Sequence, residues 1–174
     1  MSAFDRTIRP LLWDPEQILR GYVAPGDTVA DIGCGAGYYA PALSKFAGPS
    51  GTLFLVDVQE DMLKRSTRRL RRASDATAQA VPVLAGDDRF DLSDELDFAL
   101  MSWMLHEVER PALLWENVGE HLRPAGKALV IEPWVHVRRR RFEEEVAPAR
   151  ELGFATAEID DILFCHACVA TRMV

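Results

Sequence analysis

The chain has 174 residues, enough for one α/β domain with a buried sheet and too few for a second domain of ordinary size. Hydrophobic residues make up 48% and charged residues 27%, which is typical of globular proteins and excludes a disordered chain. The net charge of -7 argues against a nucleic-acid partner, because nucleic-acid-binding proteins usually carry positive charge to displace counterions from phosphates. We expect one domain over residues 1–174, with a short helical segment over 1–25 and a core over 26–174.

Residues 1–9 include Asp5, Arg6 and Arg9 and have no apolar centre, so we expect neither a secretory signal nor a membrane span there. The three cysteines, an odd number, form no disulfide framework. Both features favour the reducing cytoplasm.

Helical stretches and short apolar runs alternate along most of the chain. Asp14 and Pro15 begin the first helix, since Asp caps free N–H groups and Pro tolerates the first helical position. We expect strands at 28–32, 52–56, 80–85, 97–102 and 127–132, and helices from Gly37 to Phe46 and at 60–72 and 111–122. This alternation predicts a parallel sheet with helices on both faces.

The C-terminal part has a different pattern. A helix over 142–151 is followed by two strands, 154–159 and 162–171, with almost nothing between them. Strands joined so closely must be antiparallel.

Residues 29–37, Val-Ala-Asp-Ile-Gly-Cys-Gly-Ala-Gly, form a strand that enters three alternating glycines before a helix. Glycines let the backbone approach a ligand closely, and free N–H groups at a helix start favour an anionic group. Asp57 ends the next strand, where a carboxylate can accept hydrogen bonds from both ribose hydroxyls. Together these residues predict a nucleoside-containing cofactor.

A dinucleotide is one such cofactor, since residues 35–40 satisfy a loose Gly-x-Gly-x-x-Gly/Ala pattern. Two features favour another cofactor: Asp31 lies inside the first strand, and the chain ends in an antiparallel pair.

Residues 29–37 resemble the first motif of class I S-adenosylmethionine-dependent methyltransferases, an acidic residue followed by Gly-x-Gly-x-Gly. Asp57 resembles the ribose-binding acid of that family, and Asp87 resembles the acid near the adenine amino group. Residues 97–108 resemble the fourth strand with the loop beside the transferred methyl group, and 122–127 the turn before the fifth strand. Several motifs in order are far more specific than one.

The resemblance implies a Rossmann-like, doubly wound sheet of seven strands, mostly parallel, with an antiparallel last strand and helices on both faces. It implies S-adenosylmethionine as cofactor and S-adenosylhomocysteine as product. The cofactor would lie across the carboxyl ends of the strands, at the switch point between the first and fourth. Its expected contacts are Asp31, Gly33, Cys34, Gly35, Gly37, Asp57, Val58, Asp87, Asp88 and Ser102.

A small-molecule acceptor should enter nearby, and the candidate pocket residues are Trp13, Trp103, Glu132, Trp134 and His136. A sulfonium is already an activated methyl donor, so alignment and desolvation matter most. A base helps only when the nucleophile arrives protonated, and His106 is the candidate.

Other clusters have simpler interpretations. Cys165 and Cys168 are three apart on a strand and point to opposite faces, so we expect buried thiols and no metal site. Arg65, Arg68, Arg69 and Arg72 fall on one helical face, which we interpret as solvated. Residues 138–141 are basic and 143–145 acidic, so these charges largely neutralise each other.

The leading hypothesis is a methyltransferase for small molecules, resembling the quinone, sterol and arsenite branch. Little of the chain is available to form a lid, so the pocket is either open or completed by a second subunit of a homodimer. The same feature motivates a second hypothesis, a non-catalytic cofactor-binding module or sensor. A nucleotide-dependent oxidoreductase is a third, based only on residues 35–40.

Overall fold

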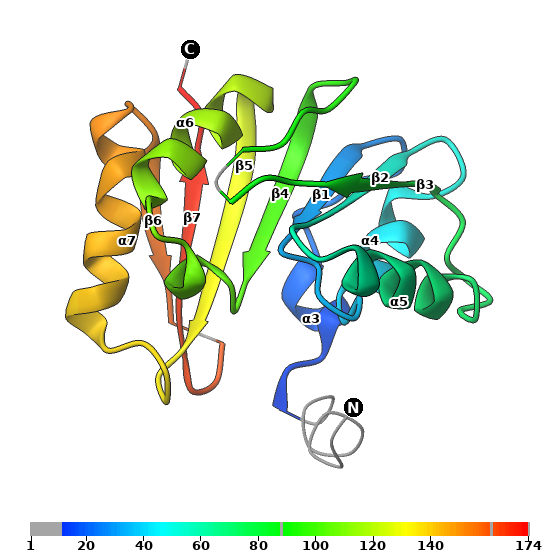
Figure 1. Cartoon of the computed structure of the whole chain (residues 1–174), viewed down its shortest axis with the longest axis horizontal. Coiled ribbons are helices and arrows are strands. Elements are labelled where there is room, and N and C mark those ends of the chain that lie inside the picture. The colour runs from blue at the N-terminus through cyan, green and yellow to red at the C-terminus, as the bar shows by residue number, and fades with distance from the viewer. Residues whose placement is uncertain (1–11, 88, 161, 174) are drawn as a thin grey trace.

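The computed structural model describes residues 12–87, 89–160 and 162–173. Seven strands form one sheet in the order β3-β2-β1-β4-β5-β7-β6 (Figure 1). Their bounds are β1 (Thr28–Ile32), β2 (Thr52–Asp57), β3 (Gln79–Leu84), β4 (Leu96–Ser102), β5 (Leu122–Pro133), β6 (Ala155–Ile159) and β7 (Cys165–Thr171). The pairings among β1 to β5 are parallel, whereas β7 is antiparallel to both β5 and β6. The predicted sheet, including its antiparallel last strand, is confirmed.

The helices lie on both faces of this sheet. They are α3 (Pro15–Leu19), α4 (Ala40–Ala47), α5 (Glu60–Leu70), α6 (Pro111–His121) and α7 (Arg139–Glu151), with the 3-10 turn η1 (Leu105–Glu107) between β4 and α6. Buried side chains of α3, α4 and α5 pack with Val29 of β1, and those of α6 and α7 pack with Ala30. Neighbouring strand residues point to opposite faces, so both faces of β1 are covered.

Several boundaries differ from the prediction. The last helix begins at Arg139, three residues earlier than expected, because Arg139, Arg140 and Arg141 pair with glutamates four residues later within the same helix. The fifth strand begins at Leu122, which pairs with Leu96 before a register shift in β4. The last strand begins at Cys165, so the hairpin connection is longer than expected.

The position of the site follows from the strand order. β1 is hydrogen-bonded to β2 on one side and to β4 on the other, so the chain reverses its direction of winding at β1 (Figure 1). In open sheets of this kind a crevice forms beyond the carboxyl ends of the strands at that point. Residues 33–39 after β1, Asp57 at the end of β2 and Trp103 after β4 all lie at these ends.

In the part of the chain that the structure describes, no helix is both long and apolar enough to span a membrane.

Candidate functional site

The glycine loop after β1 is fixed to the end of β2. The backbone N–H groups of Gly33 and Cys34 both donate to the carbonyl of Val56, at 2.8 and 3.0 Å. The N–H of Gly37 then donates to the Cys34 carbonyl at 2.9 Å and closes the turn. The loop is therefore a rigid continuation of the sheet.

Gly35 and Gly37 have different structural roles. Both have positive φ, +49° and +74°, a conformation that favours glycine. A Cβ on Gly35 would have no atom within 4 Å, whereas a Cβ on Gly37 would lie 2.8 Å from the Cα of Ser66 in α5. Gly35 thus leaves open space above the loop, and Gly37 allows α5 to pack closely. The predicted cofactor role of Gly37 lacks support here, since it lines neither of the cavities beside the loop.

Asp57 joins this loop to the next strand. Its side chain is 7% exposed, and its two carboxylate oxygens accept the backbone N–H groups of Gly35 at 2.8 Å and Gln59 at 2.9 Å. A carboxylate oxygen has more than one lone pair, so each oxygen can accept a further hydrogen bond from a hydroxyl. The group is fixed in position and still able to bind a diol.

A cavity of about 550 Å³ lies on the Asp57 side of the loop. Its lining includes the predicted residues Gly33, Gly35, Asp57, Val58 and Asp87. The lining also includes apolar and acidic side chains that sequence reasoning did not assign to the site: Met62, Phe90, Met104, Glu107, Val108, Glu109 and Leu114. The predicted contact Asp88 lies outside the described residues.

A smaller cavity of about 240 Å³ adjoins the loop and shares Gly33, Gly35 and Trp103 with the larger one. Of the predicted residues it is lined by Asp31, Cys34 and Ser102. It is also lined by Tyr38, Tyr39 and Arg69, which sequence reasoning did not assign to the site.

Buried polar groups lie around this smaller cavity. Asp31 is 3% exposed, and the hydroxyl of Ser102 is buried with no hydrogen-bond partner in the described part of the chain. Burial, reinforced by the negative charges of Asp31 and Asp57, raises the pKa of the Cys34 thiol. Cys34 is therefore a neutral, buried thiol beside the smaller cavity.

These features fit S-adenosylmethionine. A nucleoside requires a diol acceptor beside an apolar cavity, which Asp57 and the larger cavity provide. An amino-acid end requires polar groups in a smaller space, which Asp31 and Ser102 provide. The open space at Gly35 lies between the two cavities, where the ligand would cross the backbone.

Trp103 is one of the three residues that line both cavities. Its φ of +58° lies in the left-handed region, which is costly for a non-glycine residue. Its N–H donates to the Ile131 carbonyl at 2.8 Å, and its ring packs edge to face with Trp13 at 5.1 Å. Such strain is concentrated at functional sites in proteins, so Trp103 is a strong candidate for contact with a ligand.

Trp13, in the segment before α3, packs against Trp103. It is buried, its indole N–H donates to the Leu163 carbonyl at 2.6 Å, and its own carbonyl accepts the Tyr38 hydroxyl at 2.7 Å. Of the predicted pocket residues, Trp13 and Trp103 are therefore brought together.

Glu132 lies behind the loop that follows β4 and does not line a cavity. It is fully buried, and its Oε1 accepts the backbone N–H groups of Met104, Leu105 and His106 at 3.2, 2.7 and 3.4 Å. Its Oε2 lies 2.6 Å from Nδ1 of His106. Burial raises the pKa of Glu132, although His106 and the Leu105 N–H act in the opposite direction. Glu132 thus positions His106 and η1 from inside the protein.

His136 and Trp134 lie on the loop after β5 and are exposed. The rings of His136 and His106 are parallel, with centroids 5.9 Å apart. Trp134 contacts the rings of Phe164 and His166. His136 therefore adjoins the His106 group, whereas Trp134 lies on the β7 side.

Cys165 and Cys168 point to opposite faces of the sheet, as expected from their spacing on a strand. Cys165 belongs to the core cluster on one face and Cys168 to the cluster on the other, and all three cysteines are buried thiols outside any disulfide. Burial raises the pKa of Cys168 to about 11. Among the described residues, no group of three or more His, Cys, Asp or Glu side chains could hold a metal ion.

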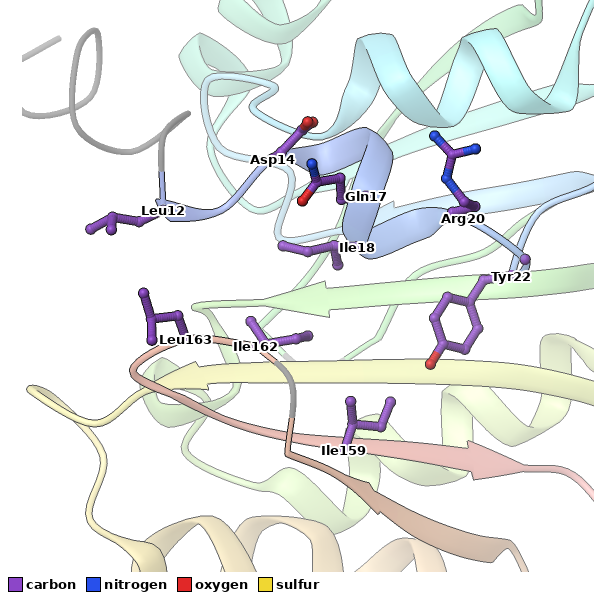
Figure 2. A pocket seen from close by; sticks show the side chains of 10 residues that line it. Leu12, Asp14, Gln17, Ile18, Arg20, Tyr22, Ile159, Ile162 and Leu163 are labelled. Atoms are coloured by element: carbon purple, nitrogen blue, oxygen red, sulfur yellow. The ribbon is translucent and has the colours of Figure 1, made fainter.

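Another cavity, of about 320 Å³, lies between α3 and the connection from β6 to β7 (Figure 2). Ile18 and Tyr22 face Ile159 and Ile162 across it, and Asp14 and Arg20 lie on the α3 side. It shares no lining residue with the two cavities at the glycine loop, so it is separate from the candidate site.

A family model described as a methyltransferase domain matches residues 30–128 of this chain. A ubiquinone/menaquinone biosynthesis C-methyltransferase of Cupriavidus metallidurans is 30% identical over 122 residues, which are 70% of this chain and 49% of that protein. A demethylmenaquinone methyltransferase of Staphylococcus carnosus is 28% identical over 121 residues, with the same coverage of both chains. The chain spans about half the length of these curated relatives.

Solved structures agree in fold. A methyltransferase from Aquifex aeolicus, described as dependent on S-adenosylmethionine, superposes with a TM-score of 0.82 at 24% identity, covering 97% of this chain and 94% of that one. A methyltransferase from Pyrococcus furiosus gives a TM-score of 0.72 at 14% identity, covering 98% and 95%.

Proposed function

Since this chain belongs to the class I S-adenosylmethionine-dependent methyltransferases, we propose that it is an enzyme that transfers a methyl group from S-adenosylmethionine to a small-molecule acceptor. The proposal covers residues 1–174 as a single catalytic domain. The observation that carries it is the fixed, buried carboxylate of Asp57 between the open backbone at Gly35 and the larger cavity.

The residues that hold the cofactor divide between the two cavities. Asp57, with Val58 and Asp87, holds the nucleoside in the larger cavity, and Asp31 and Ser102 hold the methionine end in the smaller one. When bound, the cofactor supplies a sulfonium methyl group that is already activated for in-line attack. Trp103, which lines both cavities, excludes water and orients the acceptor at their junction.

His106 accepts a proton when the attacking atom of the acceptor carries one. Glu132 accepts a hydrogen bond from Nδ1–H, which fixes the ring and leaves Nε2 as the basic nitrogen. His136 is stacked on the same ring, and the two histidines lie outside the residues that line the two cavities. Glu132 acts through His106 and is a positioning residue.

The names of two relatives support one class of acceptor. One is named a ubiquinone/menaquinone biosynthesis C-methyltransferase and the other a demethylmenaquinone methyltransferase, and this chain matches about half of each. We propose an aromatic hydroquinone or phenol, which has a protonated nucleophile and a flat ring that can pack against Trp103, the aromatic residue that lines both cavities.

A transfer assay tests the function. Purified protein is incubated with S-adenosylmethionine and, separately, reduced naphthoquinones, simple phenols, amines and thiols, and S-adenosylhomocysteine release is measured. Release with the reduced quinones or phenols, abolished in Asp57→Ala and reduced in His106→Ala at unchanged cofactor affinity, supports the proposal. Tight cofactor binding without transfer to any class would favour the non-catalytic binding module instead.

A cytoplasmic location and a homodimer belong to the same proposal. Three buried cysteine thiols that form no disulfide are consistent with a reducing compartment. Large apolar side chains are exposed on two adjacent loops near the site, Trp134 and Val135 after β5 and Leu163 and Phe164 before β7. Sedimentation equilibrium of wild type and Phe164→Asp tests whether two copies associate there.

A further inference from the structure

Arg69 differs from the other arginines of α5. Arg65 and Arg68 are exposed, as expected of a solvated helical face, and Arg72 just after the helix is exposed as well. Arg69 is only partly exposed and lines the smaller cavity beside the glycine loop. The interpretation of all four as one solvated face is therefore wrong for Arg69. Its position follows from the close packing of α5 on the loop at Gly37 and Ser66, one turn earlier.

The guanidinium of Arg69 is held at the cavity by an aromatic ring. Its central carbon lies 5.4 Å from the centroid of Tyr38, a cation–π contact. The Tyr38 hydroxyl donates to the Trp13 carbonyl at 2.7 Å, which holds the ring in place. A planar cation stacked in this way loses less side-chain freedom when it binds a second group through its edge.

The smaller cavity is therefore lined by both a negatively and a positively charged side chain. Asp31 contributes a carboxylate from the end of β1, and Arg69 contributes a guanidinium from α5. The backbone of Gly33 and Gly35 forms the side shared with the nucleoside cavity. An amino-acid group, which carries one ammonium and one carboxylate, matches this arrangement of charges.

We propose that Arg69 binds the carboxylate at the methionine end of the cofactor, opposite the ammonium that Asp31 accepts. This inference rests on the proposed function, because it assigns a residue to the same cofactor. A guanidinium can donate two parallel N–H groups to a carboxylate, and such charge-assisted pairs are stronger than neutral hydrogen bonds.

The test compares two ligands that differ only in the proposed group. S-adenosylmethionine and decarboxylated S-adenosylmethionine are titrated calorimetrically into wild type, Arg69→Gln, Arg69→Lys and the matched control Arg68→Gln. Arg68 lies on the same helix and is exposed, and it does not line the smaller cavity. The Arg68 variant therefore controls for the loss of one positive charge on α5.

Arg69→Gln should weaken S-adenosylmethionine binding by about 10- to 100-fold and leave the decarboxylated ligand within about twofold of wild type. Arg69→Lys should recover part of the loss, because it keeps the charge without the planar pair of donors. If Arg69→Gln weakened the binding of both ligands equally, or of neither, the inference would be overturned while the proposed function stands. Failure of wild type to bind either ligand would overturn both.

Discussion

The carboxylate of Glu132 at the end of β5 holds both the ring of His106 and the turn that carries it. One oxygen of Glu132 lies 2.6 Å from Nδ1 of His106. The other oxygen accepts the backbone N–H groups of Met104, Leu105 and His106, and the hydrogen bond from Leu105 is the shortest. Both oxygens are fully buried, so water cannot replace either contact. A single side chain therefore couples the core of the sheet to the proposed base.

Loss of this carboxylate should destabilise the protein. Glu132→Ala leaves buried N–H groups without an acceptor and should lower the free energy of unfolding by about 2–4 kcal/mol. Urea denaturation followed by circular dichroism measures the change. The exposed Glu116→Ala on α6 is the control, expected within about 0.5 kcal/mol of wild type. If the free energy of unfolding changed equally little in Glu132→Ala and Glu116→Ala, the structural role of Glu132 would be contradicted.

The raised pKa of Glu132 predicts a pH dependence with a definite sign. Because burial makes the folded carboxyl hold its proton to higher pH than the unfolded one, its contribution to stability is largest below the unfolded pKa. That contribution is lost as pH rises through the folded pKa. The free energy of unfolding of wild type minus that of Glu132→Gln should therefore fall with increasing pH above about 4.3 and then level off. A difference that rises with pH would mean that the pKa is lowered instead.

Two glycines of the same loop should respond differently to alanine. Gly37→Ala places a Cβ 2.8 Å from the Cα of Ser66. The backbone of α5 must then shift, so the free energy of unfolding should fall by about 2–4 kcal/mol. Gly35→Ala has open space and should cost only about 1–2 kcal/mol for its positive φ. Gly35→Ala should instead weaken S-adenosylhomocysteine binding by at least about tenfold, since its methyl group enters the ligand space. Equal effects on stability and binding would contradict this division of roles.

Cys34 should react slowly with alkylating reagents. Its pKa is raised by burial and by two nearby carboxylates, so little nucleophilic thiolate forms at pH 8. Iodoacetamide labelling read by peptide mass spectrometry should be at least about tenfold slower than in urea-unfolded protein, and slower still with S-adenosylhomocysteine. Rapid labelling that the ligand does not change would place Cys34 away from the cofactor.

The sequence was most informative for site residues that directly follow a strand. Asp57 and the loop that contains Gly35 could be predicted because both directly follow buried apolar runs, and parallel strands bring their carboxyl ends together. The family resemblance named Asp87 and Ser102 as cofactor contacts, and each of them lines one of the two cavities beside the loop.

Residues whose role depends on packing between distant elements could not be predicted in this way. Arg69 has the periodicity of a solvated face, and only the packing of α5 against the loop turns it toward the smaller cavity. Glu132 follows an apolar strand like a ligand-binding acid, but the turn at Leu105 folds over it and buries it. Neither arrangement has a local signal in the sequence.

Calorimetric titration of wild type and Asp57→Ala tests the central claim most directly. S-adenosylmethionine and S-adenosylhomocysteine are the ligands, NAD is the control, and circular dichroism verifies that the variant is folded. We predict that wild type binds both sulfur-containing ligands but not NAD, and that Asp57→Ala weakens both by about 100-fold. Binding of NAD alone, or of no ligand by wild type, would contradict the assignment of this site.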